Sequence, residues 1–212
     1  PTTAGATADS TVEERFAHVI ELYEAGALGM GTCDGGTIIL AFPAEDGGPP
    51  LALPGTFGNS ARDVEWALRW FKERELPVHI SIFEPGMLRL VLAHHAAGSL
   101  PQAKIQLYLG GTRMLFGLPA NATGLNAYLG MLEGTGLPWM AAVYGGDVTG
   151  TGLARLAIER GGHIRVGLED HHAPPRTPRN EELVREAVEV AHAGGRRPAT
   201  PDEAPEILWG KP

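Results

Sequence analysis

Cysteine is nearly absent from this sequence. Cys33 is the single cysteine among 212 residues, which excludes an internal disulfide framework and a zinc site built from several cysteines. This scarcity fits a reducing compartment, and we therefore expect a cytoplasmic protein. Cys33 stands in a glycine-rich stretch and no base is assigned to it, so we interpret it as incidental rather than as a nucleophile.

Long apolar runs and an excess of basic residues are absent as well. No apolar run approaches the length needed to span a bilayer, and the first residues lack the charged and apolar regions of a signal peptide. The 17 basic residues are outnumbered by 25 acidic ones, which gives a net charge of -8. Because phosphate backbones and anionic lipids repel such a chain, we expect neither nucleic acid nor a membrane as a partner.

Nucleotide-binding glycine motifs are also missing. No GxGxxG fingerprint lies at a predicted strand-to-helix turn. Residues 32–37 (TCDGGT) contain a glycine pair but lack the spacing and the lysine of a phosphate-binding loop. The sequence therefore gives no sign of a dinucleotide site or of a phosphate-binding loop.

What is present is a regular alternation of helices and strands. Apolar residues make up 43% of the chain, enough for a sizeable core, and their spacing switches between helical and extended periods. Helices are predicted at 11–24, from 60 or 61 to 74 (after Asn59 or Ser60 as cap), and at 86–97, 123–133, 153–160, 181–192 and 201–208. Strands are predicted within 27–42 and at 77–84, 104–109, 137–144 and 164–168. Five strands with helical crossovers indicate either an open doubly wound sheet or part of a (β/α)8 barrel.

The predicted starts of the first and last helices depend on their capping residues. Ser10 and Glu13 have the spacing of a capping box. Thr200 and Pro201 fit a cap followed by proline at the first helical position. Residues 43–59 are rich in proline and glycine, and we predict that they form a loop or an excursion from the sheet.

Residues 161–170 (GGHIRVGLED) form the most informative stretch of the chain. An extended strand over 164–168 places Arg165 and Glu169 on the side opposite its apolar residues, and helices on both sides in the sequence predict that this charged side faces an enclosed space. Four residues of strand separate the two charges by roughly 13 Å, so we predict that they do not pair with each other. Glu169 and Asp170 come at the carboxyl end, where parallel α/β folds bind ligands. The alternative is a structural ion pair of Glu169 with another residue.

The strand at 77–84 has the same kind of alternation. Val78, Ile80 and Ile82 are predicted to lie on one face. His79 and Ser81 then point toward the interior of the sheet, by the same reasoning as for Arg165 and Glu169.

At this point the residues resemble a known family, the β-keto acid cleavage enzymes, whose best-known member type is 3-keto-5-aminohexanoate cleavage enzyme. The arginine-to-aspartate signature at 165–170, preceded by Gly-Gly-His, is the most specific part of the resemblance. Weaker similarities follow in the right order over nearly the whole chain. They lie at 1–5 (PTTAG), 109–111 (LGG), 137–139 (LPW), 180–184 (NEELV) and 199–204 (ATPDEA).

The resemblance implies a (β/α)8 TIM barrel with a zinc ion at its carboxyl face. It also implies an enzyme that condenses a β-keto acid with acetyl-CoA to give acetoacetate and a new acyl-CoA, and relatives that are generally oligomers. A metal ion can polarise a keto group and stabilise an enolate. The resemblance makes Glu169 a zinc ligand and gives Arg165 and Asp170 roles in the chemistry and geometry of the site.

Other residues match the family pattern less closely. A small hydroxyl residue at the end of the third strand corresponds best to Thr2, which we expect to be catalytic, or to Thr3, which we expect to bind substrate. His79 and Ser81 stand near places where the family usually has acidic residues, and we expect them to contact the substrate. Their lack of negative charge favours a neutral or anionic substituent over an amino group.

The sequence departs from the family in its metal ligands and its beginning. It contains no His-x-His pair, which the family uses on its second strand, and the first two strands have no counterpart. We therefore expect one partial TIM-barrel domain over residues 1–212, incomplete at the N-terminus, with five to six βα units and C-terminal helices at about 180–208. His171 and His172 are candidate substitutes for the missing zinc ligands.

Three hypotheses about function follow from these observations. The first is a zinc-dependent β-keto acid cleavage enzyme present as an N-terminally shortened chain. The second is a non-catalytic remnant or subunit that needs a partner chain to complete the barrel, and the third is an aldolase-like barrel with unrelated chemistry. Because an incomplete barrel exposes strand edges, we expect the isolated chain to be poorly soluble or oligomeric, with a homo-oligomer favoured.

Overall fold

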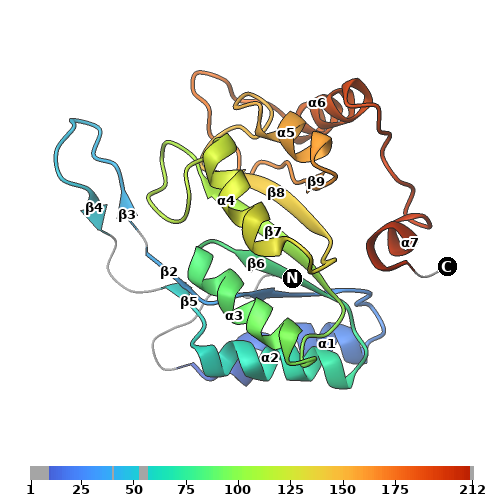
Figure 1. Ribbon diagram of the computed structural model, residues 1–212. Helices are drawn as coiled ribbons and strands as arrows, with labels where there is room; N and C mark the ends of the chain where they lie inside the picture. The colour runs from blue at the N-terminus through green and yellow to red at the C-terminus, as the bar shows by residue number, and fades with distance from the viewer. Residues whose placement is uncertain (1–9, 40, 53–56, 211–212) are drawn as a thin grey trace.

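The protein is described by a computed structural model that covers residues 10–39, 41–52 and 57–210 (Figure 1). Thr2 and Thr3 lie outside these described residues. The main sheet has five strands in the order β1-β6-β7-β8-β9, and every neighbouring pair is parallel. The strands are β1 (Gly31–Asp34), β6 (Val78–Ile82), β7 (Ala103–Gly110), β8 (Trp139–Tyr144) and β9 (His163–Ile164).

A helix follows each of the first four strands and packs against the sheet. Figure 1 shows these helices following the curve of the sheet on its outer side, with α1 packed on α2 and α6 on α5. The helices are α1 (Val12–Glu24), α2 (Ala61–Glu73), α3 (Pro85–Ala96), α4 (Ala122–Leu132), α5 (Leu153–Glu159), α6 (Asn180–Ala193) and α7 (Ala204–Trp209). The predicted α/β class is confirmed, and the arrangement is that of a partial TIM barrel.

The two faces of the sheet differ because side chains alternate along each strand. Val78, Ile80 and Ile82 of β6 are fully buried under the helices. We call the opposite surface of the main sheet, which faces away from the helices, the inner face. The parallel register places His79 beside Lys104 and Ser81 beside Gln106 on this inner face, which confirms the predicted orientation of His79 and Ser81.

Cys33 lies on β1 rather than in a loop, and it is fully buried. Burial raises the pKa of its thiol well above the ordinary value. A protonated, inaccessible thiol is not a nucleophile, which agrees with the incidental role expected from the sequence.

The segment between β1 and α2 leaves the main sheet, as its proline and glycine content predicted. It forms two short antiparallel pairs, β2 with β5 and β3 with β4, and Figure 1 shows the β3–β4 pair projecting away from the rest of the chain. These strands are β2 (Thr37–Ile38), β3 (Ala41–Phe42), β4 (Leu51–Ala52) and β5 (Phe57–Gly58).

Two predicted helix starts are wrong. The first helix is capped by Thr11 and not by Ser10, because Thr11 and Glu14 form a reciprocal capping box one residue further along. The last helix begins at Ala204, because the residues after Thr200 form a turn before the helical hydrogen bonds start. Neither shift changes which helices exist.

The predicted strand at 164–168 is too long. β9 ends at Ile164, and Leu168, predicted to be on the apolar side, is 57% exposed. The reason is a turn in which the carbonyl oxygen of Gly167 accepts hydrogen bonds from the N–H groups of Asp170 and His171. This turn reverses the chain direction, so residues after Gly167 come back toward Arg165.

Among the described residues, no helix is both long and apolar enough to cross a membrane. β1 and β9 are the edge strands of the main sheet in this part of the chain. The expected oligomer stays a prediction.

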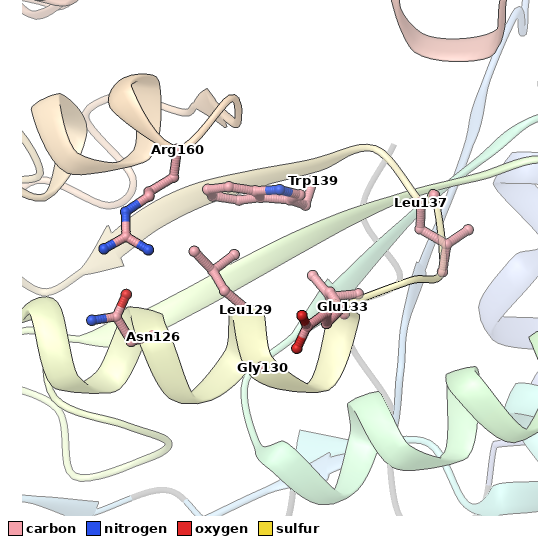
Figure 2. A pocket seen from close by; sticks show the side chains of 9 residues that line it. Asn126, Leu129, Gly130, Glu133, Leu137, Trp139 and Arg160 are labelled. Atoms are coloured by element: carbon pink, nitrogen blue, oxygen red, sulfur yellow. The ribbon is translucent and has the colours of Figure 1, made fainter.

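A groove of about 590 Å³ lies between α4, the start of β8 and the end of α5. Figure 2 shows Trp139 and Leu129 facing it, with Arg160 and Glu133 at its sides. Since Trp139 is the first residue of β8, the groove lies at the amino end of that strand. Ligands of parallel α/β folds bind at the opposite end, so this groove is not the candidate active site.

Two glycines near this groove provide a test of the packing. A Cβ atom on Gly162 would lie 2.3 Å from the Trp139 ring, whereas one on Gly130, within α4, would have no neighbour within 4 Å. We expect Gly162→Ala to lower the free energy of unfolding by about 1–3 kcal/mol through overpacking. Gly130→Ala should raise it by about 0.5–1 kcal/mol through helix propensity. Urea denaturation measures both, and equal effects would contradict the described packing.

Candidate active site

Arg165 lies at the centre of a cluster of charged residues beyond the end of β9. Its Nε atom is 2.7 Å from Oδ2 of Asp170, and its Nη2 atom donates hydrogen bonds to Oδ1 of Asp170 at 3.4 Å and to Oε2 of Glu169. The prediction that Arg165 and Glu169 do not pair is therefore wrong. It assumed a continuous strand, and the turn at Gly167 brings the two side chains together instead.

The two carboxylates of this cluster have different environments. The side chain of Glu169 is 62% exposed, whereas Asp170 as a residue is only 4% exposed. The Asp170 Oδ2 atom forms no hydrogen bond in the part of the chain that the structure describes, so its contact with Nε is an ion pair without hydrogen-bond geometry. Burial raises the pKa of Asp170 to about 6, against the opposing effect of Arg165. A carboxyl group with such a pKa can exchange a proton near neutral pH.

Aromatic rings line one side of the cluster. The Arg165 guanidinium lies 5.5 Å from the centre of the Tyr108 ring. Tyr108 stacks on Phe83 with ring centres 4.5 Å apart, and Tyr144 contacts Tyr108 edge to face at 6.0 Å. Sequence analysis missed these three residues. Their signal was present, because each is one of the last two residues of a predicted strand (77–84, 104–109 and 137–144).

The inner face holds further polar side chains below the cluster. Ser81 is buried, and Gln106 has no exposed surface. Neither amide atom of Gln106 has a hydrogen-bond partner among residues 10–39, 41–52 and 57–210. Sequence analysis also missed Gln106, although a glutamine within an otherwise apolar strand was a visible signal.

Two residues further from the carboxyl ends of β6 and β7, the inner face has a histidine and a lysine side chain. His79 and Lys104 are neighbours in the register of β6 and β7. Burial, with the nearby charges of Lys104 and Arg165, lowers the pKa of His79 to about 3. Burial also lowers the pKa of Lys104. Ser81 and His79, both predicted to bind substrate, lie on β6. Ser81 is nearer to the carboxyl end of this strand, and therefore nearer to the Arg165 cluster, than His79 is.

A cleft of about 840 Å³ opens at the carboxyl ends of β7 and β8. It adjoins the charged cluster, because the N–H group of Gly145 donates to the carbonyl oxygen of Asp170 at 2.8 Å and Gly146 lines the cleft. Glycine pairs at the end of β7 (Gly110–Gly111) and just after β8 (Gly145–Gly146) have no side chains that could fill the cleft. They also allow two loops to approach closely, since a Cβ atom on Gly111 would lie 2.3 Å from the carbonyl oxygen of Gly145.

The described residues do not provide a complete zinc site. They contain no group of three histidine, cysteine, aspartate or glutamate side chains positioned to hold a metal ion, and a zinc site needs at least three protein ligands. His171 lines a small space with Asp147, and its buried Nε2 atom has no hydrogen-bond partner in the described part of the chain, while His172 lines the cleft. Neither histidine joins Glu169 in a ligand set.

Comparison with known proteins places this site in context. A family model described as beta-keto acid cleavage enzyme matches residues 1–209. The chain is 32% identical over 139 residues to a 3-keto-5-aminohexanoate cleavage enzyme of Fusobacterium nucleatum subsp. nucleatum, which covers 64% of this chain and 48% of the relative.

A second relative is the 3-keto-5-aminohexanoate cleavage enzyme of Acetoanaerobium sticklandii. The chain is 46% identical to it over 61 residues, which covers 26% of this chain and 22% of the relative. The matches thus span about half and about a fifth of the lengths of these two relatives.

The ion pair between Arg165 and Asp170 can be measured with a double-mutant cycle of Arg165→Ala and Asp170→Ala. Because Asp170 is buried and Arg165 is partly shielded, we expect a coupling free energy of about 1–2 kcal/mol in urea denaturation. The matched control is the exposed pair Arg155–Glu159, where solvent screening should leave a coupling within experimental error. Equal coupling in the two cycles would contradict the described burial.

His79 makes the stability of the protein depend on pH. Its pKa of about 3 lies below the ordinary value of 6.5, so between these values the unfolded state binds a proton that the folded state does not. The free energy of unfolding therefore falls as the pH decreases from about 6.5 toward 3, and we expect a loss of about 1–2 kcal/mol between pH 7 and pH 5.

The measurement is urea denaturation of the wild-type protein and of His79→Gln at both pH values. In His79→Gln, the difference in the free energy of unfolding between pH 7 and pH 5 should be much smaller than in the wild-type protein. The difference that remains is expected from His163, whose pKa is also lowered by burial. The control is His192→Gln, at an exposed position in the last turn of α6. An unchanged pH dependence in His79→Gln would refute the prediction.

Proposed function

Because the chain belongs to the β-keto acid cleavage enzyme family, we propose that it cleaves a β-keto acid in a reaction with acetyl-CoA that yields acetoacetate and a new acyl-CoA. The observation that carries the proposal is the contact of Arg165 with an exposed and a buried carboxylate at the carboxyl end of a parallel sheet. A cation, a proton acceptor and an adjoining cleft together suit a substrate that is an acid with an acidic methylene group.

The proposed reaction exchanges the two acyl groups. The bond between the keto carbon and the methylene carbon of the substrate breaks, and the methylene carbon forms a new bond to the acetyl carbon of acetyl-CoA. Coenzyme A moves from the acetyl group to the released acyl group. No oxidant or reductant is needed, because the numbers of carbonyl groups and thioesters stay the same.

Asp170 is the proposed base. A methylene group between a ketone and a carboxylate must lose a proton before it can form a carbon–carbon bond. Burial brings the pKa of Asp170 close to neutral pH, and a base with such a pKa can both take up and return this proton. Its position beside Arg165 keeps the carboxylate oriented in both states.

Arg165 is proposed to bind the substrate carboxylate. Its guanidinium already contacts Asp170 and Glu169, and Glu169 is exposed enough to move away when a substrate carboxylate takes its place. A guanidinium suits this role because it can form two parallel hydrogen bonds with a carboxylate. Thr2, proposed as catalytic, and Thr3, proposed to bind substrate, lie outside the described residues, so their roles rest on the family resemblance alone.

Zinc is the proposed cofactor, with Glu169 as one ligand. A bound zinc ion would supply a Lewis acid for the keto group. The described residues do not complete its ligand set, so at least two further donors are required from elsewhere.

We propose a neutral or anionic substituent on the β-keto acid. The two named relatives are called 3-keto-5-aminohexanoate cleavage enzymes, and that substrate has an amino group. On the inner face of this chain, His79 and Lys104 are neighbours, and Lys104 forms no ion pair with another described residue. His79, with a pKa of about 3, is uncharged at neutral pH, so it is the ammonium group of Lys104 that repels a cationic substituent and attracts an anion.

The cleft at the ends of β7 and β8 is the proposed binding site for the acyl-CoA. It adjoins the Arg165 cluster and is large enough for an extended ligand. Backbone amides of its glycine-rich loops and the start of α4 at Asn121 give it hydrogen-bond donors.

A second candidate function is a non-catalytic subunit that requires a partner chain. The incomplete metal-ligand set of the described residues favours this candidate. Acetoacetate formation by the isolated protein distinguishes the two candidates.

The test is an assay of the full-length protein with acetyl-CoA and three kinds of β-keto acid: cationic, neutral and anionic. Acyl-CoA products are measured by mass spectrometry. We expect turnover of the neutral or anionic acids, and we expect Asp170→Asn to lower kcat/KM by at least about 100-fold through loss of the base. Glu159→Gln, at a surface position on α5, is the control.

Three further outcomes separate the parts of the proposal. Removal of metal with a chelator should abolish turnover and added Zn²⁺ should restore it, so turnover that survives complete metal removal would exclude the zinc requirement. Full activity of Asp170→Asn would exclude Asp170 as the base, and absence of any acyl-CoA product would exclude the proposed reaction.

A further inference from the structure

Tyr108 holds a fixed position on the inner face of β7. Its neighbours Leu107 and Leu109 are fully buried on the helix side, and Tyr108 itself is 4% exposed. The ring is stacked on Phe83 at an interplanar angle of 3° and is contacted edge to face by Tyr144. Two aromatic contacts and burial leave the phenol little freedom, so its hydroxyl group has a defined direction.

The hydroxyl group of Tyr108 forms no hydrogen bond with any residue that the structure describes. Buried phenol groups nearly always have a hydrogen-bond partner. Tyr128 on α4 provides the comparison, because it is also fully buried and its hydroxyl group donates to the carbonyl oxygen of Phe83 at 3.3 Å. Both tyrosines contact Phe83, Tyr108 through its ring and Tyr128 through its hydroxyl group, and of the two only Tyr108 has a donor without a partner among the described residues.

Charged groups of the candidate active site surround Tyr108. The Arg165 guanidinium lies over its ring, and Asp170, Glu169 and Asp34 are close enough to influence its ionisation. Burial and these carboxylates raise the pKa of Tyr108 above the ordinary value. The phenol therefore stays protonated at neutral pH and can act as a donor.

We propose that the Tyr108 hydroxyl group donates a hydrogen bond to the ketone oxygen of the bound β-keto acid. The inference rests on the proposed function. A β-keto acid has its ketone two carbon atoms from its carboxylate, so one molecule can contact Arg165 with the carboxylate and Tyr108 with the ketone. The Arg165 guanidinium is already engaged by carboxylates, whereas the Tyr108 donor is unused.

A neutral donor at this oxygen assists the reaction. Negative charge develops on the ketone oxygen both when the methylene group loses a proton and when the keto carbon is attacked. A donor held in place by the packing of its ring stabilises this charge with little reorganisation, and one such donor typically contributes about 100–1,000-fold to kcat. Tyr108 is thus a catalytic residue of the proposed reaction that acts through one hydrogen bond.

The test compares Tyr108→Phe with the matched control Tyr128→Phe in the full-length protein. Tyr108→Phe should lower kcat by about 100–1,000-fold and leave the Tm unchanged, because no hydrogen bond to another described residue is lost. Tyr128→Phe should lower the Tm and leave kcat nearly unchanged, because it removes the hydrogen bond to Phe83. Wild-type kcat in Tyr108→Phe would overturn the inference.

A binding measurement separates this inference from the proposed activity. Acetoacetate is itself a β-keto acid, and calorimetry gives its Kd without turnover. Tyr108→Phe should raise this Kd by about 5- to 10-fold through loss of one hydrogen bond, even if the wild-type protein forms no acyl-CoA. An equal Kd in wild-type and variant would overturn the role of Tyr108, and absence of acetoacetate binding to the wild-type protein would overturn both proposals.

Discussion

Parallel pairing of the five strands is the constraint on which the rest of the structure depends. It places every carboxyl end at one edge of the sheet, and alternation then divides each strand between helix-facing and inner side chains. The apolar helix-facing side chains fix the register, because a slip by one residue would expose all of them. The same register brings Ser81, Gln106 and Tyr108 onto one surface. Burial of the apolar side chains under the helices therefore also determines which polar side chains lie together on the inner face.

The Arg165 cluster stabilises the loop after β9 and also limits what the site can do. One guanidinium contacts two carboxylates, one buried and one exposed. The buried Asp170 depends on Arg165 for compensation of its charge, so this contact is expected to persist. The ion pair between the exposed Glu169 and Arg165 contributes little free energy, so little stability is lost when Glu169 leaves Arg165. A substrate carboxylate or a metal ion would therefore compete for the Glu169 contact, and binding of either would rearrange that side chain alone.

Much of the fold was predictable from the sequence because the helices and strands have clear apolar periods. The inner orientation of His79 and Ser81 followed from alternation with Val78 and Ile80. The error over Arg165 and Glu169 came from extending the same rule through Gly167, where backbone hydrogen bonds close a turn. Periodicity predicts which side of a strand a residue occupies, but it does not predict where the strand ends.

The residues of the candidate site were predictable to different degrees. Arg165, Glu169 and Asp170 form a contiguous motif, so the sequence by itself singled them out. Tyr108 and Tyr144 come from β7 and β8 and Phe83 directly follows β6, so these residues are distant in the sequence and only the register of the strands brings their rings together.

The sequence by itself determined the α/β class, the five strands and the family, because these depend on local periodicity and on a contiguous motif. Tertiary structure alone decided that Asp170 is buried while its neighbour Glu169 is exposed. It alone also decided that the Tyr108 hydroxyl group, on a ring beside Arg165, has no hydrogen-bond partner among the described residues. Burial and hydrogen bonding depend on which distant segments pack together, and neighbouring positions in a sequence do not contain that information.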